Sequence, residues 1–194
     1  KSKAIAVLSR LENEADFPQN KTFAQANLMK LFYENKDYPN SVVYAEKVLN
    51  NSKTDDNVKS DAQIIIARAA IQTGDEAKAH SAYAKLQTIA QGELAAEALY
   101  YEAYFKNKDA KFETSNEIVQ KLAKNYSGYK FFGAKGLILM AKNFYGLKDS
   151  FQATYILDSV IQNFTDFPDV VSEAKTELDR IKSEESKTNS SITN

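Results

Sequence analysis

The sequence predicts an all-helical fold because of its composition, the spacing of its apolar residues and a repeated segment. Its 194 residues include 6 Gly and 3 Pro, which is few for a domain built from strands and tight turns. Apolar residues recur at three- and four-residue steps, as they do on one face of a helix. Four apolar stretches each end in a Lys-Asp or Gly-Asp turn, at Asp37, Asp75, Asp109 and Asp149.

Each of these turns lies between two helical stripes. Before Asp75, the residues Ala62, Ile65 and Ala69 form one stripe, and Ala82 and Leu86 belong to the next. Asp is favourable in front of a helix because its side chain accepts hydrogen bonds from the first backbone N–H groups. The turn Asp residues lie 38, 34 and 40 residues apart, which predicts an array of helix pairs.

A helix-turn-helix unit of about 34 residues resembles the tetratricopeptide repeat (TPR) family. With the turn Asp at the family's turn, the first-helix aliphatic positions hold Leu28, Ile66, Tyr100 and Met140, and the small ones hold Ala67 and Ala141. The aromatic positions hold Phe32, Tyr104 and Phe144, and the small second-helix positions hold Ser41, Ala79, Ser115 and Ala153. Met29, Tyr101 and Ala70 depart from the pattern, and the third unit fits only with a turn two residues longer, through Lys111 and Phe112. Over residues 22–163, the resemblance implies a right-handed α-α superhelix of antiparallel helix pairs.

The resemblance implies a single solenoid over residues 1–183. Its parts are the helix of a truncated preceding repeat at 2–16, repeats at 22–55, 60–93, 94–129 and 134–167, and a capping helix at 169–183. The last helix carries charged residues on its outer face, as the end of a solenoid requires. Residues 184–194 are rich in Ser, Thr and Asn without a periodic apolar face, and we expect a disordered tail there.

Composition and motifs argue against several kinds of chemistry. The chain has no Cys and one His, which excludes a thiolate metal site, a Cys nucleophile and a multi-His zinc site. A formal net charge of -1 argues against binding to nucleic-acid phosphate. No phosphate-binding loop, dinucleotide motif or nucleophile elbow occurs, and the longest uncharged run, 8 residues, is too short to span a membrane. We therefore expect no enzyme activity, metal, cofactor, nucleic-acid partner or membrane span.

First helices line a concave groove in the TPR family, so the resemblance places a peptide-binding groove on specific residues. One ring of equivalent positions holds Lys30, Arg68, Glu102 and Lys142, and the ring one turn later holds Tyr33, Ile71, Phe105 and Tyr145. A third ring holds Ala26, Ile64, Ala98 and Ile138. Aromatic side chains offer contact area and cations offer orientation, so we expect the groove to bind a protein or peptide segment. The alternative is that the aromatics pack on the adjacent helix and the charges are solvated.

Three segments, 26–30, 44–49 and 148–153, resemble the C-terminal part of large bacterial cell-envelope TPR proteins. This resemblance implies a non-enzymatic scaffold for protein–protein interaction within an envelope assembly or secretion system. It also implies a periplasmic or outer-membrane-associated location, with a cytoplasmic one left open. The alternative function is a structural C-terminal capping piece of a longer TPR protein. Such a piece would act through self-association, as a homo-oligomer formed by the exposed N-terminal helix.

Overall fold

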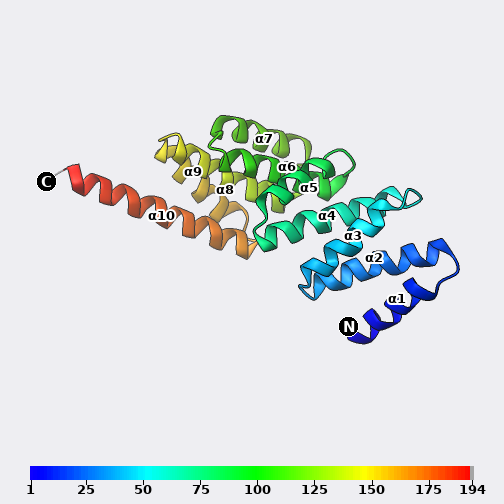
Figure 1. The fold of residues 1–194 in the computed structure, drawn as a ribbon. Coiled ribbons are helices and arrows are strands. Elements are labelled where there is room, and N and C mark those ends of the chain that lie inside the picture. Colours follow the sequence, from blue (N-terminus) through cyan, green and yellow to red (C-terminus); the bar gives the residue numbers. More distant parts are fainter. Residues whose placement is uncertain (193–194) are drawn as a thin grey trace. The chain divides into compact units, whose positions relative to one another are not determined.

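The computed structural model describes the backbone of residues 1–192 and the side chains of residues 1–187. Every regular element in that part of the chain is an α-helix, which confirms the all-helical prediction (Figure 1). The helices divide into two compact units, Lys1–Ala90 and Gln91–Asn194.

The first unit is one helix followed by two helix pairs. Its elements are α1 (Ser2–Glu14), α2 (Pro18–Glu34), α3 (Tyr38–Asn50), α4 (Asp56–Thr73) and α5 (Glu76–Leu86) (Figure 1). Each helix packs against the next along the chain, and α2 also contacts α4. Fully buried side chains at the helix contacts include Leu28, Met29, Tyr83 and Leu86.

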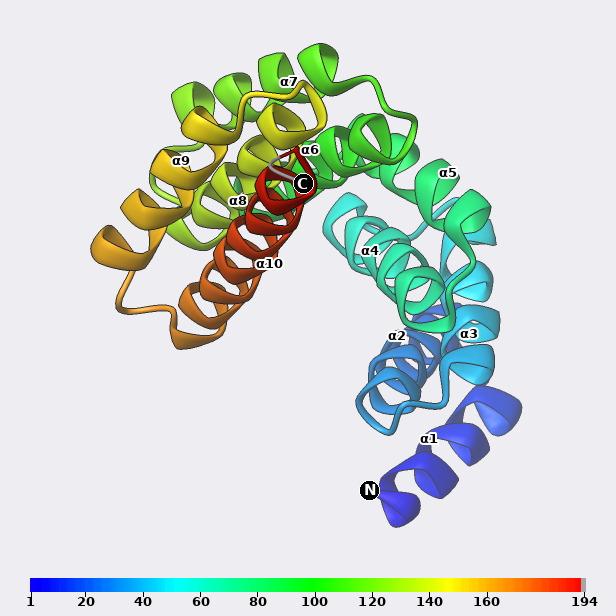
Figure 2. The ribbon, with the colours of Figure 1, turned by 90° about the vertical axis from the view of Figure 1, so that its left-hand side faces the viewer.

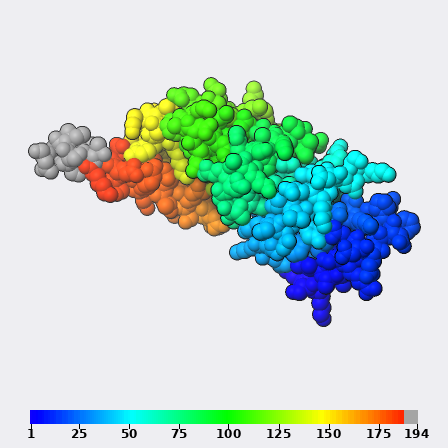
Figure 3. Space-filling model, in the orientation of Figure 1, coloured from blue at the N-terminus to red at the C-terminus, as the bar shows by residue number. Residues whose placement is uncertain are grey.

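The second unit is two helix pairs followed by one helix. Its elements are α6 (Gly92–Lys108), α7 (Phe112–Asn125), α8 (Lys130–Gly146), α9 (Ser150–Asn163) and α10 (Pro168–Ile192). Neighbours pack in order, α6 also contacts α8, and α10 lies against both α9 and α8 (Figure 2). Side chains fill the spaces between these ribbons (Figure 3), and the buried cluster under α10 contains Leu157, Val160, Leu178 and Ile181.

The four turns inside the helix pairs have one geometry. A residue with positive φ ends the first helix of each pair, at Lys36, Gly74, Ala110 and Lys148. The next backbone N–H then donates to the carbonyl five residues earlier, at 2.9 Å in all four turns. This is the Schellman arrangement that satisfies the last carbonyls of a helix. We call the residue after the positive-φ residue the N-cap residue: Asp37, Asp75, Lys111 and Asp149.

Asp side chains cap three of the four second helices, as the sequence predicts. The carboxylates of Asp37, Asp75 and Asp149 each accept a hydrogen bond from the backbone N–H three residues later. The third turn differs, because Asp109 is the C-cap residue of α6 and the N-cap residue of α7 is Lys111. Asp109 instead forms an ion pair with the Lys111 ammonium at 3.2 Å.

In each helix pair, one buried residue from each helix lies at the contact between the two helices. Most of these residues are small, which lets the helices approach closely. Four residues after the N-cap residue stand Ser41, Ala79, Ser115 and Ala153, all inaccessible to solvent. Eight residues before it stand Met29, Ala67, Ala103 and Ala141, also inaccessible. Ser41 and Ser115 donate hydrogen bonds to the carbonyls of Met29 and Ala103 across this contact. The small second-helix residues that the sequence predicts are therefore buried. In α6, the sequence alignment placed the small first-helix position at Tyr101, but in the structure this position is held by Ala103.

A buried amide network joins three helices of the second unit. Asn143 of α8 is inaccessible to solvent, and its amide donates to Ser115 and to Asn116 of α7, each at 2.8 Å. The side-chain amide of Asn107 of α6 donates to the side-chain amide oxygen of Asn143 at 2.7 Å. Every hydrogen-bonding group of Asn143 is thus used, as burial of an amide requires.

Hydrogen bonds and an ion pair attach α1 to the rest of the first unit. None of its residues is fully buried, although Leu8 and Leu11 are partly covered. The Glu12 carboxylate accepts hydrogen bonds from Lys47 of α3 at 2.7 Å and from Gln25 of α2 at 3.0 Å. On the opposite face of α1, Val7 is 67% exposed.

The last helix is longer than the sequence predicts. We expected a disordered tail from residue 184, but α10 continues to Ile192; residues 193 and 194 lie outside the described part of the chain. Polar contacts extend beyond the apolar stripe: Tyr145 donates to Glu184 at 2.8 Å, and Ser150 donates to Glu185 at 2.9 Å. The helix therefore continues where apolar periodicity has ended.

Candidate protein-binding face

The predicted groove residues lie on the first helix of each pair. Lys30 and Tyr33 are on α2, Arg68 and Ile71 on α4, Glu102 and Phe105 on α6, and Lys142 and Tyr145 on α8. Lys30 is exposed, Phe105 is buried, and the other six are partly buried. Two members lie in each helix, and each compact unit holds four of them.

Two of the predicted cations each form an ion pair with the helix two places further along the chain in the same unit. The Lys30 ammonium lies 2.5 Å from Asp61 of α4, and the Lys142 ammonium lies 3.5 Å from Glu173 of α10. The partners follow each lysine by 31 residues in both cases, so the two pairs occupy equivalent positions. Both lysines therefore connect neighbouring helices, and this contact is separate from any role in binding a partner.

Tyr145 is also engaged within its own unit. Its hydroxyl donates to the Glu184 carboxylate, and the Arg180 guanidinium lies 5.0 Å from its ring centre. The hydrogen bond to Glu184 raises the pKa of Tyr145. Hydrogen bonds from Arg180 and Tyr145 lower the pKa of Glu184. Here α10 covers the residues that would face a ligand in the predicted groove.

The two predicted residues of α6 are displaced from the rings they were assigned to. Lys30 and Lys142 stand seven residues before the N-cap residue, and the same distance in α6 leads to Tyr104, not Glu102. Phe105 is 7% exposed and occupies the position of the buried Asn143. Its ring packs near Tyr104 and Tyr101, at centroid distances of 5.4 and 6.3 Å. Phe105 thus belongs to the interior of the second unit.

A pocket of about 570 Å³ opens between α2, α4 and the segment that joins α3 to α4. It includes two of the predicted groove positions, Lys30 and Ala26. Its remaining lining comes from α2, the connecting segment and the start of α4: Pro18, Gln19, Thr22, Phe23, Asn27, Asn51, Lys53, Thr54, Asp55 and Val58. We call this the α2/α4 pocket.

The α2/α4 pocket has an apolar wall and polar edges. Phe23, which is 59% exposed, contributes the largest apolar side chain. Lys30 and Lys53 contribute ammonium groups; Lys53 is exposed and forms no ion pair within residues 1–187. Asp55 uses its carboxylate to cap α4, accepting a hydrogen bond from the Asn57 N–H at 2.8 Å. The pocket is therefore suited to an apolar side chain next to a negative charge.

Phe23 was not among the predicted site residues, although its position carries a signal. Fourteen residues before the N-cap residue, α4 has Asp61 and α8 has Lys135, which form ion pairs with α2 and α10, respectively. In α2 the same position holds an exposed Phe. An apolar residue where the equivalent residues are charged could have been recognised once the turns were aligned.

Two of the connecting residues form a rigid edge for the α2/α4 pocket. Thr54 is buried and donates to the Val48 carbonyl at 3.0 Å. Asn51 donates to the Thr22 hydroxyl of α2 at 2.7 Å. The first bond holds the segment between α3 and α4 to the end of α3 and the second holds it to α2, so this edge of the pocket is fixed at two points.

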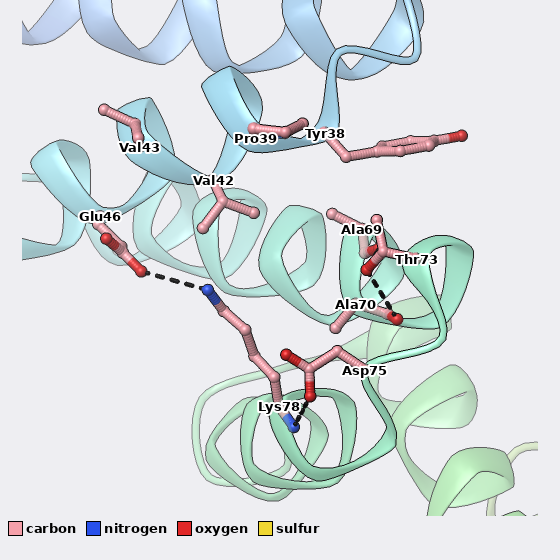
Figure 4. A pocket seen from close by; sticks show the side chains of 10 residues that line it. All are labelled: Tyr38, Pro39, Val42, Val43, Glu46, Ala69, Ala70, Thr73, Asp75 and Lys78. Carbon is pink, nitrogen blue, oxygen red and sulfur yellow. Dashed lines mark hydrogen bonds and ion pairs between the residues drawn. The ribbon is translucent and has the colours of Figure 1, made fainter.

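A second hollow, of about 360 Å³, lies between α3, α4 and α5 (Figure 4). Val42, Ala69 and Ala70 form its apolar floor, and an ion pair between Glu46 and Lys78 crosses one end at 3.6 Å. None of the predicted groove residues lines it.

The chain matches no protein-family model and no curated protein. Within the described residues, no helix has the length and hydropathy to cross a membrane. Acidic and His side chains there form no cluster of three that could hold a metal ion. The lone His80 is exposed at the start of α5, as expected for a solvated position.

Proposed function

We propose that this chain is a non-enzymatic, TPR-like scaffold that binds a segment of another protein on the face formed by its first helices. The α2/α4 pocket carries the proposal, because it combines an exposed aromatic, a fixed backbone edge and cations. Aromatic anchors in pockets supply most of the binding energy in protein interfaces. The predicted groove position Lys30 lies at this pocket, and Phe23 would be its central anchor.

The finer fold assignment is part of the same proposal. In a TPR superhelix, antiparallel helix pairs stack with a constant small rotation and create an extended binding surface. Four turns of one geometry, buried small residues at fixed distances from them and helices that pack in chain order support this assignment. The right-handed superhelix and the bacterial envelope location are inferences from the resemblance of the sequence.

The bound segment is expected to present a bulky apolar side chain with an Asp or Glu nearby. Phe23 and Val58 would contact the apolar side chain, and Lys53 would attract the carboxylate. Lys53 is better placed for this than Lys30, since Lys30 already pairs with Asp61. Charge at the edge of such a site mainly sets orientation and association rate.

Selection from a displayed library of random 12-residue peptides tests the proposal, with the full chain as bait. We expect enriched sequences to share an apolar residue flanked by acidic ones, and Phe23→Ala to lose them. Ile89→Ser is the matched control, because Ile89 is an exposed apolar residue of the same unit that does not line the pocket. Failure to enrich any sequence, or binding that survives Phe23→Ala unchanged, would refute the proposal.

Lys53→Glu provides the second arm of the selection. The enriched peptides should then carry basic instead of acidic residues next to the same apolar residue, because Lys53 forms no ion pair within residues 1–187 that the substitution would break. Lys30→Glu is less informative, since it also places two carboxylates together at Asp61. Peptides that bind wild type and Lys53→Glu equally would show that charge at the pocket edge plays no part.

A further inference from the structure

The outer face of α9 carries two exposed aromatic residues. Phe151 is 76% exposed and Tyr155 is 66% exposed. Residues four and seven positions apart lie on one side of a helix, so Phe151, Tyr155 and Asp158 form a single stripe. Asp158 is exposed and forms no ion pair within residues 1–187.

The packing of the second unit does not require aromatic residues at these positions. Phe151 and Tyr155 stand two and six residues after the N-cap residue Asp149. The equivalent residues of α7 are Glu113 and Glu117, which are exposed charged residues on a well-packed helix. Exposed aromatic residues on a surface that tolerates charge are typical of a contact with another molecule.

In the first unit, a neighbouring helix brings a basic side chain to the last residue of the equivalent stripe. On α3 the corresponding residues are Pro39, Val43 and Glu46, which are exposed and line the second hollow together with residues of α4 and α5 (Figure 4). Lys78 of α5 reaches Glu46 at 3.6 Å. Glu46 and Asp158 both stand nine residues after the N-cap residue. A helix that brings a basic side chain to Asp158 and aliphatic surface to the two aromatic rings would therefore suit the α9 stripe.

The chain itself contains a helix with this chemistry. On α1, Lys3, Val7 and Arg10 have the same four- and seven-residue spacing, with the exposed Val7 at the centre. Lys3 is exposed and forms no ion pair within the described residues, and Arg10 pairs only with its neighbour Glu14. Leu8 and Leu11 of the same helix are partly buried, whereas all three residues of this stripe are exposed.

We propose that the α1 stripe of one copy binds the α9 stripe of a second copy, with Val7 against Phe151 and Tyr155 and Lys3 at Asp158. The two stripes are complementary in charge, and each has an apolar centre. Because different surfaces of the two copies meet, the contact is heterologous and copies add head to tail. This inference does not depend on the α2/α4 pocket, since neither stripe lines it.

Sedimentation velocity of the full chain tests this inference, over about 10 µM to about 1 mM, the range suited to one small helix–helix contact. Wild type should shift from monomer to species larger than a dimer. Val7→Ser and Phe151→Ser/Tyr155→Ser should each remain monomeric while keeping wild-type circular dichroism. Mixing the two variants should restore a 1:1 dimer and nothing larger, because each retains one intact stripe.

Exchanging the charges of Asp158 and Lys3 distinguishes the proposed pairing from non-specific association. Asp158→Lys should abolish association, and adding Lys3→Glu to the same chain should restore it. Phe17→Ser is the matched control, since Phe17 is 64% exposed but belongs to neither stripe. The inference fails if wild type is monomeric throughout, if association survives in both stripe variants, or if it survives in Phe151→Ser/Tyr155→Ser alone, which would indicate an α1–α1 dimer.

Discussion

Asn143 is a polar residue in a place where its fold equivalents are apolar. At this distance before the N-cap residue, α2 has Leu31 and α4 has Ala69, whereas α8 has an amide with no exposed surface. The amide is stable there because Ser115, Asn116 and Asn107 satisfy it completely. Such a network fixes how the three helices align, since an apolar contact would permit several alignments.

Asn143→Leu should destabilise the protein by about 2 kcal/mol, because two buried polar partners and the partly buried Asn107 lose hydrogen bonds while the volume hardly changes. Urea unfolding followed by circular dichroism measures the loss. Asn163→Leu is the control and should stay within about 0.5 kcal/mol, since Asn163 is exposed at the end of α9. An Asn143→Leu protein as stable as wild type would mean that the network only sets alignment.

Glu12 links the attachment of α1 to pH. Burial alone would raise the pKa of Glu12, but hydrogen bonds from Lys47, Gln25 and Tyr44 outweigh it and lower the pKa. A carboxyl whose pKa is lower in the folded state stabilises the fold above its unfolded pKa, and this stabilisation is lost as pH falls through the folded pKa.

Wild type should therefore be more stable than Glu12→Gln at pH 7. The advantage should begin to shrink as pH falls through the ordinary range of a Glu, about pH 4, and should vanish once pH is below the lowered pKa of the folded protein. Urea midpoints of both proteins across this range provide the measurement. Glu14→Gln should show no comparable change, because Glu14 is exposed and pairs only with Arg10. A constant difference between wild type and Glu12→Gln at every pH would contradict the assignment.

At the scale of elements, the helix pairs follow from apolar periodicity and turn chemistry, and three of the turns contain the Asp caps that the sequence predicts. The turn after α6 could not be placed in this way, because its Asp, Asp109, stands before the positive-φ residue Ala110 and the N-cap residue is Lys111. The resulting two-residue shift in α6 moved Glu102 and Phe105 from their expected rings. The end of α10 was missed for a different reason: polar contacts from Tyr145 and Ser150 hold it, and these leave no apolar pattern.

The geometry of the turns predicts how glycine at the positive-φ position changes the stability of the protein. Lys36, Ala110 and Lys148 adopt a left-handed conformation that costs a residue with a side chain about 1 kcal/mol. Replacing any of them by Gly should raise stability by up to about 1 kcal/mol, and Gly74→Ala should lower it by a similar amount. A Cβ at Gly74 would meet no atom within 4 Å, so its cost is conformational alone. Thermal midpoints of the four variants decide this, with Gly128→Ala as a neutral control.

At the scale of the molecule, α10 is the apolar cover and polar surface at the end of the second unit. Val170, Leu178 and Ile181 face the cluster on α8 and α9, while Lys175 and Lys182 are exposed. A helix array needs a helix of this kind wherever stacking stops, because the preceding pair would otherwise expose its apolar side. Glu173 and Glu177 of the same helix are partly buried and form ion pairs, and the capping role of α10 stays a prediction.

Leu178→Ala should weaken amide protection in α9 and α10 by about 2–3 kcal/mol, the cost of a cavity in a packed core. Lys175→Ala on the exposed face is the control and should change nothing measurable. Hydrogen exchange of the backbone amides, measured separately for each helix, tests this prediction. An equal loss of protection in all ten described helices would show that the two compact units unfold as one.

Only part of the proposed site was predicted from the sequence, since the resemblance pointed to the first helices, two of which line the α2/α4 pocket, but not to Phe23. Lys30 and Ala26 do line a pocket, yet Lys30 and Lys142 also hold helices together, and Tyr145 lies under α10. Phe23 was missed because its importance depends on the charged residues at equivalent positions. Those comparisons require aligned turns, which in turn depend on backbone conformation.

The shared turn geometry also bears on how such a chain can diverge. Backbone hydrogen bonds close each turn, and Lys, Gly and Ala all occupy the positive-φ position. What each pair keeps is a compact contact at two buried positions, and even these vary between Ser, Ala and Met. No single amino acid is common to the four pairs at these positions, so substitutions there can leave the turn hydrogen bonds and the buried contact in place. Pairs of this kind are therefore better recognised by the distances between the turn and the buried positions than by the identity of residues.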